Sequence, residues 1–229
     1  MIADFEALDR APKDPLDLAH RKRLENIQNQ GWRGYLKQKL DRASSGKAYR
    51  FEFSGNYPAS DDPGNIRHDG YPGDKAGKTY ERIQRGQIVC KEDDIYILLI
   101  GMNDALNLGV DLAKGKVDIN PTFSAMTGIA TSIREDDPAL FLWGKIPYIT
   151  DLAKDRNPKY IPTNVNLPIK YINQHVGSEA SFFGATVFDL QNLFIDNPSF
   201  TDDGFHFSDA GNRHVASLLF EMIQKKINK

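Results

Sequence analysis

Residues 203–206 read Asp-Gly-Phe-His and lead directly into a helical pattern near the C-terminus. An imidazole acts as a general base when a carboxylate fixes its tautomer and stabilises its charged form. A carboxylate three residues earlier in a loop can fold back onto the ring, so Asp203 and His206 are candidates for a general-base pair. A lone Asp-x-x-His more often marks a helix-capping turn with an exposed histidine, because short motifs match by chance.

A second stretch carries an amide side chain at the end of an apolar run. Residues 95–100 read Ile-Tyr-Ile-Leu-Leu-Ile and continue as Gly-Met-Asn-Asp at 101–104. The run is apolar on both faces, which predicts an interior strand of a sheet that is covered on both sides. Ligands of such sheets bind beyond the carboxyl ends of the strands, where the Asn103 amide can donate to a developing oxyanion. The alternative is a polar turn residue that caps the next helix.

The third stretch, residues 69–74, reads Asp-Gly-Tyr-Pro-Gly-Asp before a helical pattern. A glycine such as Gly73 in this kind of loop can present its backbone N–H to an anion. Taken alone, the stretch indicates no more than a Gly/Pro turn.

The elements that must position these groups alternate between strands and helices, which is typical of an α/β fold with a mostly parallel sheet. No internal repeat or low-complexity linker interrupts them. Residues 1–15 contain only three bulky apolar side chains, Ile2, Phe5 and Leu8, and so make a poor central strand. The predicted strands are 49–53, 95–100, 139–143 and 186–190. The predicted helices are 16–40 (interrupted near Gly31), 76–85, 121–134, 164–176 and 208–227, and residues 145–162 form a polar connection.

Composition excludes several classes of function. The chain has 229 residues, 40% of them hydrophobic and 26% charged, with a net charge of −2, so no broad attraction to nucleic acid or to a membrane surface is expected. Cys90 is the only cysteine, which excludes an internal disulfide and a zinc site of several thiolates. No cofactor or metal is predicted. Without a signal-peptide pattern the chain as written is predicted to be cytoplasmic, and a secretory leader would have to lie upstream of Met1.

Together, and in this order, the three stretches resemble the SGNH/GDSL family of serine hydrolases, in which four blocks contribute a Ser, a Gly, an Asn and an Asp-x-x-His. Residues 68–73 resemble the second block, which implies that Gly73 is an oxyanion-hole donor. Residues 101–104 resemble the third, with Asn103 as the other donor. Residues 203–211 resemble the last, with Asp203 and His206 as catalytic residues.

The resemblance covers residue 31 to the C-terminus, since residues 31–36 (Gly-Trp-Arg-Gly-Tyr-Leu) resemble the helix after the nucleophile loop. It implies a three-layer α/β/α sandwich with a mostly parallel, flavodoxin-like sheet. We expect one domain over residues 1–229, with an atypical N-terminal segment at 1–15.

The nucleophile block of the family has no counterpart in this sequence. No Ser, Thr or Cys lies between Met1 and Ala43, although the family's Gly-Asp-Ser belongs a little before Gly31. Ser54 and Ser60 match no family position, so the nucleophile is unknown. Without it, Asp203 and His206 can still activate a water, at a small residual rate.

Three hypotheses follow from the sequence. The first is an ester hydrolase whose nucleophile strand lies upstream of Met1 or is supplied in another way. The second is an inactive relative that binds a carbohydrate or acyl ligand, and the third is an unrelated α/β protein. The expected substrate is a small-molecule or carbohydrate ester. The polar connection carries aromatic and polar side chains that suit a sugar ester better than a long acyl chain, namely Tyr148, Asp151, Arg156 and Tyr160. The alternative is that this connection is a solvated loop.

Overall fold

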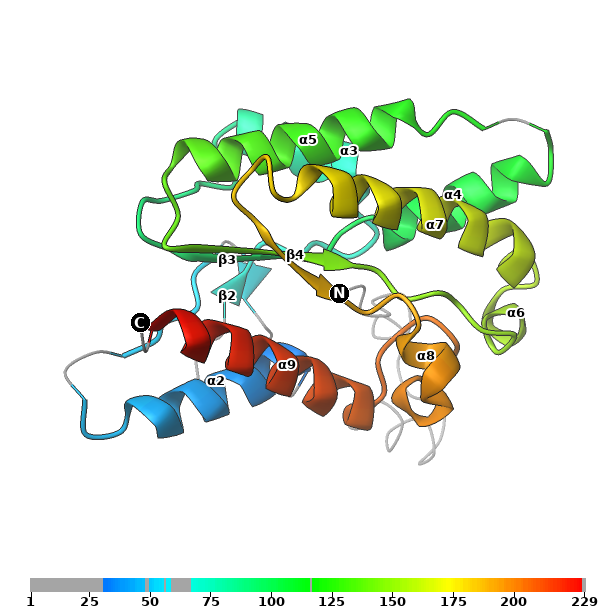
Figure 1. The fold of residues 1–229 in the computed structure, drawn as a ribbon. Coiled ribbons are helices and arrows are strands. Elements are labelled where there is room, and N and C mark those ends of the chain that lie inside the picture. Colours follow the sequence, from blue (N-terminus) through cyan, green and yellow to red (C-terminus); the bar gives the residue numbers. More distant parts are fainter. Residues whose placement is uncertain (1–30, 48–49, 56, 59–66, 116, 228–229) are drawn as a thin grey trace. The chain divides into compact units, whose positions relative to one another are not determined.

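The computed structural model describes residues 31–47, 50–55, 57–58, 67–115 and 117–227 (Figure 1). Contacts divide the chain into two compact units, which are described separately. One is Gly73–Phe207, and the other combines Met1–Pro72 with Ser208–Lys229. That all of it makes one domain stays a prediction.

The unit Gly73–Phe207 contains a parallel three-stranded sheet in the order β3-β4-β5 (Ile95–Leu98, Leu140–Lys145 and Thr186–Asp189). The register places Ile97 opposite Leu142 and Trp143 opposite Val187. Helices lie between the strands in sequence, as parallel crossovers require. Figure 1 shows the four longer ones on one side of the sheet: α3 (Ala76–Gln84), α4 (Met102–Leu112), α5 (Asn120–Glu135) and α7 (Pro162–Glu179). The predicted parallel α/β architecture is confirmed.

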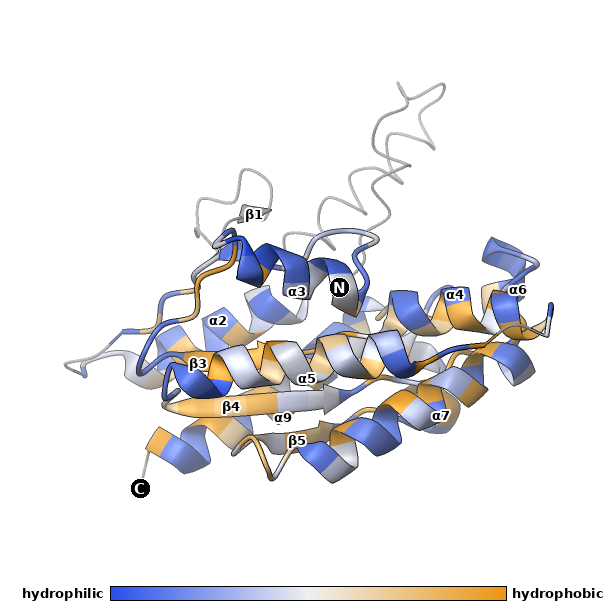
Figure 2. Cartoon of the chain, turned by 90° about the horizontal axis from the view of Figure 1, so that it is seen from above, coloured by the Kyte–Doolittle hydropathy of each residue, from blue (hydrophilic) through white to orange (hydrophobic). Residues whose placement is uncertain are grey.

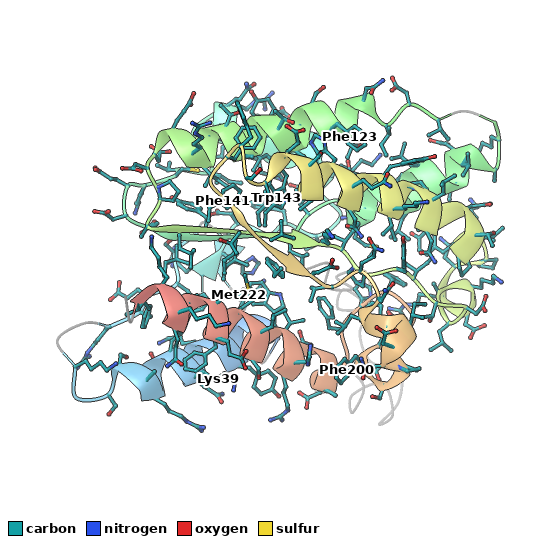
Figure 3. The ribbon with its side chains drawn as sticks, in the orientation of Figure 1. Lys39, Phe123, Phe141, Trp143, Phe200 and Met222 are labelled. Atoms are coloured by element: carbon teal, nitrogen blue, oxygen red, sulfur yellow. The ribbon has the colours of Figure 1, made fainter. Side chains whose placement is uncertain are left out.

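The core of this unit lies between the sheet and these helices. Phe141 and Trp143 are two residues apart on β4, so they share the face toward α5 and α7, and their rings stack 5.8 Å apart (Figure 3). The strand is coloured as hydrophobic along most of its length in Figure 2, whereas α3 is largely hydrophilic. Both α5 and α7 carry a proline in the first turn, where its missing N–H costs no hydrogen bond.

Two predicted strands need separate treatment. Within the described sheet, β3 pairs with β4 and its residues are half-buried, whereas β4 pairs on both sides. That residues 95–100 form an interior strand stays a prediction. Apolar side chains on both faces predict burial, but the pairing of a strand depends on distant residues. Residues 50–53 form no strand, and Tyr49 lies outside the described residues.

The other predicted elements of this unit appear within a few residues of their expected ends. Helix α4 has no counterpart among the predicted helices. The polar connection after β4 contains one short helix, α6 (Ala153–Arg156), and β5 is followed by α8 (Leu193–Asp196) and the short 3-10 helix η2 (Pro198–Phe200).

The second unit is built on two helices that pack against each other, α2 (Trp32–Ser44) and α9 (Asp209–Ile227). Val215, Leu219 and Ile223 recur at helical spacing on α9 and are fully buried, as the pattern predicts. The Trp32 N–H at the start of α2 donates to Asn212 Oδ1 at 2.9 Å. A two-residue antiparallel pair, β1 (Tyr57–Pro58) with β2 (Arg67–His68), completes the described part of this unit. The predicted helix 16–40 is described only from Trp32 onward, and none of the described helices is long and apolar enough to cross a membrane.

Candidate active site

The Asp203–His206 segment is a short closed loop after β5. An isolated antiparallel bridge joins Thr201 to Phe207 at its base, and the Thr201 hydroxyl accepts the Gly204 N–H at 2.9 Å. Gly204 has a φ of +89°, which residues other than glycine rarely adopt because their Cβ clashes with the backbone. The loop is therefore fastened at both ends and turns sharply at its glycine, which brings the residues on either side of Gly204 together.

Asp203 and His206 meet in this loop. His206 Nδ1 lies 2.6 Å from Asp203 Oδ2, and Asp203 Oδ1 accepts the backbone N–H groups of Phe205 at 3.2 Å and His206 at 2.9 Å. Burial acts to raise the pKa of Asp203, but the hydrogen bond and charge of the His206 side chain, together with the two N–H groups, outweigh it and lower the pKa. Asp203 is therefore an ionised carboxylate that accepts the Nδ1–H of the ring.

The opposite ring nitrogen is the chemically available one. With the proton on Nδ1, Nε2 carries a lone pair. This atom is buried and has no hydrogen-bond partner among the described residues. A buried polar atom without a partner is uncommon in folded proteins, and catalytic groups are among the recognised exceptions. The pair can therefore accept a proton from a hydroxyl or a water that approaches Nε2.

Residues of the connection after β4 surround this loop. The Thr150 N–H donates to the Gly204 carbonyl at 3.0 Å, and the Arg156 guanidinium lies 3.9 Å from Asp203 Oδ2. Tyr160 meets the Phe205 ring edge-on at a centroid distance of 5.7 Å. Two side chains of this connection, Arg156 and Tyr160, therefore lie against the Asp203–His206 segment.

The glycine and the asparagine of the other two motifs are also neighbours. Gly73 is exposed and has a φ of +74°, and the turn that it forms leads into α3. Asn103 lies in the first turn of α4, and its side-chain Nδ2 donates to the Asp74 carbonyl at 2.9 Å. An amide nitrogen carries two hydrogens, so one N–H of Asn103 is left to donate elsewhere.

The structure thus brings Asp203 together with His206, and Asn103 together with the turn of Gly73. No contact between the two pairs appears among the described residues. Their common location follows from the topology, because Asn103 follows β3 while the Asp203 loop follows β5 and contacts the segment after β4. The carboxyl ends of parallel strands lie at the same end of the sheet, so the connections that leave them start there too. That the two pairs face a single crevice stays a prediction.

One functional candidate was missed at the sequence level. Asp104 is 4% exposed and accepts two hydrogen bonds, from the Ala76 N–H and the Thr122 hydroxyl. Its position directly after the candidate donor Asn103 is the signal in the sequence that could have identified it. The ring of His175 on α7 stacks on Phe123 of α5 at a centroid distance of 4.5 Å. No group of three His, Cys, Asp or Glu side chains in the described ranges is arranged to hold a metal ion.

The sequence and the fold are similar to those of known hydrolases. The model of the GDSL-like lipase/acylhydrolase family matches residues 21–214. A crystal structure of a lipase/acylhydrolase from Enterococcus faecalis is similar with a TM-score of 0.52 and 16% identity, over 83% of this chain and 85% of that one. The α/β hydrolase LAE5 from the metagenome of Lake Arreo, Spain, is similar with a TM-score of 0.56 and 13% identity, over 84% of this chain and 80% of that one. Among curated proteins, no sequence matches.

The similarity to two solved hydrolases confirms the predicted fold class, the α/β sandwich fold of the SGNH hydrolases. The family match extends over most of the chain and includes all three motif regions, residues 68–73, 101–104 and 203–211. The chain therefore belongs to the GDSL-like lipase/acylhydrolase family.

Proposed function

We propose that this protein is a carboxylic ester hydrolase in which His206 is the general base and Asp203 orients and stabilises it. The observation that carries the proposal is the 2.6 Å contact of His206 Nδ1 with Asp203, together with the unpartnered Nε2. In this arrangement Nε2 takes the proton of the attacking hydroxyl and later returns it to the leaving group. The ionised Asp203 stabilises the imidazolium that forms between these steps.

The oxyanion of the tetrahedral intermediate requires donors that are held in place before the reaction. We assign this role to the backbone N–H of Gly73 and the second N–H of the Asn103 amide. The bond from Asn103 to the Asp74 carbonyl supports the assignment, because it orients the amide and ties it to the residue after Gly73. Removal of one such donor typically costs about 10²–10³ in kcat.

Two kinds of attacking group are compatible with this mechanism, a hydroxyl side chain and a water molecule. A hydroxyl side chain would form an acyl-enzyme, whereas a water activated by His206 would attack the ester directly. The substrate class that we propose is an acetylated carbohydrate. Arg156 and Tyr160 support it, since both contact the Asp203–His206 loop and offer polar and aromatic contacts of the kind that a sugar ring can use.

A second candidate function is favoured by one specific observation. The first 43 residues contain no Ser, Thr or Cys, so the family's nucleophile block is not matched in this sequence. An inactive relative that binds a carbohydrate or acyl ligand would retain the fold and the donors without turnover.

Hydrolysis of p-nitrophenyl acetate by the 229-residue chain tests the two candidates. A general-base role predicts turnover that is lost in His206→Ala and retained in His214→Ala, an exposed histidine of α9 that serves as the matched control. In the same preparations, a fluorophosphonate probe followed by peptide mapping identifies any activated hydroxyl. Turnover without labelling indicates activated water. The absence of both turnover and labelling would contradict the hydrolase proposal for this chain and favour the binding function.

A further inference from the structure

Asp104 is a buried carboxylate that the proposed mechanism does not use. It lies in the first turn of α4, directly after Asn103, and is 4% exposed. Burial raises its pKa, although hydrogen bonds from the Ala76 N–H and the Thr122 hydroxyl act against the rise. A buried carboxylate is unfavourable unless such bonds compensate for its lost hydration, so its position calls for a physical reason.

The two bonds of Asp104 connect three helices. Oδ2 accepts the N–H of Ala76, the first residue of α3, at 3.0 Å. Oδ1 accepts the hydroxyl of Thr122, in the first turn of α5, at 3.1 Å. The carboxylate thus caps the start of α3, where no side chain of α3 or its N-cap residue does so, and it is held in place from the other side by α5.

The residue before Asp104 holds the same turn. Asn103 Nδ2 donates to the Asp74 carbonyl at 2.9 Å, two residues before the Ala76 N–H that Asp104 accepts. Two consecutive residues of α4 are therefore hydrogen-bonded to the backbone at Asp74 and Ala76, immediately after Gly73. The side-chain carboxylate of Asp74 has a different partner, because it accepts a hydrogen bond from Arg82 Nε of α3 at 2.8 Å.

We propose that Asp104 is a positioning residue that fixes the Gly73 turn against Asn103, so that both oxyanion donors point to one place. The proposal deepens the function proposed above and rests on it. Donors stabilise an oxyanion strongly only when their geometry is set in advance, and a displacement of about 1 Å can cost about 10²-fold in rate. Asp104 acts through Ala76 and does not touch the substrate.

The test compares variants that break different bonds of Asp104. Asp104→Ala removes both bonds, and Thr122→Val removes only the bond to α5. Asp104→Asn preserves both, because its oxygen can accept the Ala76 N–H and its NH₂ can donate to the Thr122 hydroxyl. Ala76→Pro breaks the α3 bond from the other side, at a first helical position where proline is tolerated, and serves if Asp104→Ala does not fold.

Esterase kinetics on the full chain supply the first readout. We expect Asp104→Ala and Ala76→Pro to lower kcat at least about tenfold with KM nearly unchanged, since misplaced donors weaken transition-state binding alone. Asp104→Asn and Thr122→Val should keep kcat within about threefold of wild type, well below the loss of a donor. An equal loss of kcat in Thr122→Val and Asp104→Ala would show a purely structural role and overturn the proposal.

The second readout does not need turnover. In ¹⁵N-labelled full-length protein, the backbone amide signal of Gly73 and the side-chain amide signals of Asn103 report the geometry of the turn. Asp104→Ala should shift them, and Thr122→Val should not. If wild type proves inactive, the proposed function fails while these signals still decide the positioning role. Unchanged Gly73 and Asn103 signals in Asp104→Ala would overturn it in either case.

Discussion

Replacement of Gly204 by alanine is expected to destabilise the protein and displace the Asp203–His206 loop. A Cβ at this position would lie 2.5 Å from the backbone nitrogen of Ala153 and 2.9 Å from Thr150 Oγ1. The backbone cannot yield easily, because the Gly204 N–H and carbonyl are both hydrogen-bonded, to Thr201 Oγ1 and to the Thr150 N–H. Two costs therefore add: a steric overlap and an unfavourable φ of +89°.

The magnitude follows from these two terms. A residue with a Cβ at positive φ costs about 1–2 kcal/mol relative to glycine. Relief of an overlap with fixed backbone costs about a further 1–3 kcal/mol. Gly204→Ala should thus lower the free energy of unfolding by about 2–5 kcal/mol, a large part of the about 5–15 kcal/mol that holds a typical domain together.

Gly184→Ala is the matched control. Gly184 has a φ of +70°, but no heavy atom lies within 4 Å of its added Cβ, so this variant carries the backbone cost alone. Urea unfolding followed by circular dichroism measures both variants, and the difference between them isolates the overlap at position 204. Equal losses in the two variants would refute the close packing of the loop against Ala153. Esterase activity, where present, should fall in Gly204→Ala and persist in Gly184→Ala.

Three further predictions concern the site. The lowered pKa of Asp203 means that its stabilising effect is complete above the unfolded pKa of about 4 and is lost as the pH falls through the lower folded value. Urea unfolding between pH 7 and pH 3 should therefore show a smaller acid-induced loss for Asp203→Asn than for wild type. Asn103→Ala should cost about 1 kcal/mol of stability by calorimetry, since it removes one hydrogen bond, that to the Asp74 carbonyl. Arg156→Ala should cost less than about 1 kcal/mol, because the guanidinium lies 3.9 Å from Asp203 and is 43% exposed; a larger loss would indicate a stronger contact.

The contact between Asp203 and His206 was predictable because it is local. Three residues separate the two side chains, and a turn at Gly204 is enough to close the distance to 2.6 Å. Helical segments were predictable for a similar reason. The spacing of apolar residues over 209–227 predicts which face of the helix is buried, whatever element packs against that face.

The place of β3 shows where this reasoning stops. Its apolar residues predict an interior strand, and within the described sheet β3 pairs with β4, whereas β4 pairs on both sides. Apolar residues on both faces predict that a strand is buried on both faces. They do not predict which strands pair with it, because pairing joins residues far apart in the chain. Ile97 and Leu142, for example, become partners only when α4 and α5 cross over the sheet.

By itself, then, the sequence determined the order of the motifs, the identity of the Asp203–His206 pair and the α/β class, because each depends on short-range spacing or on periodicity. Tertiary structure alone decided the partners of Asp104, which are 28 and 18 residues away, and the approach of Tyr160 to Phe205. Such contacts depend on how the helices pack against the sheet. That packing involves side chains from the whole unit and not from one segment alone. The place of Asp104 beside Asn103 is visible in the sequence, but its hydrogen bonds to Ala76 and Thr122 are not, for this reason.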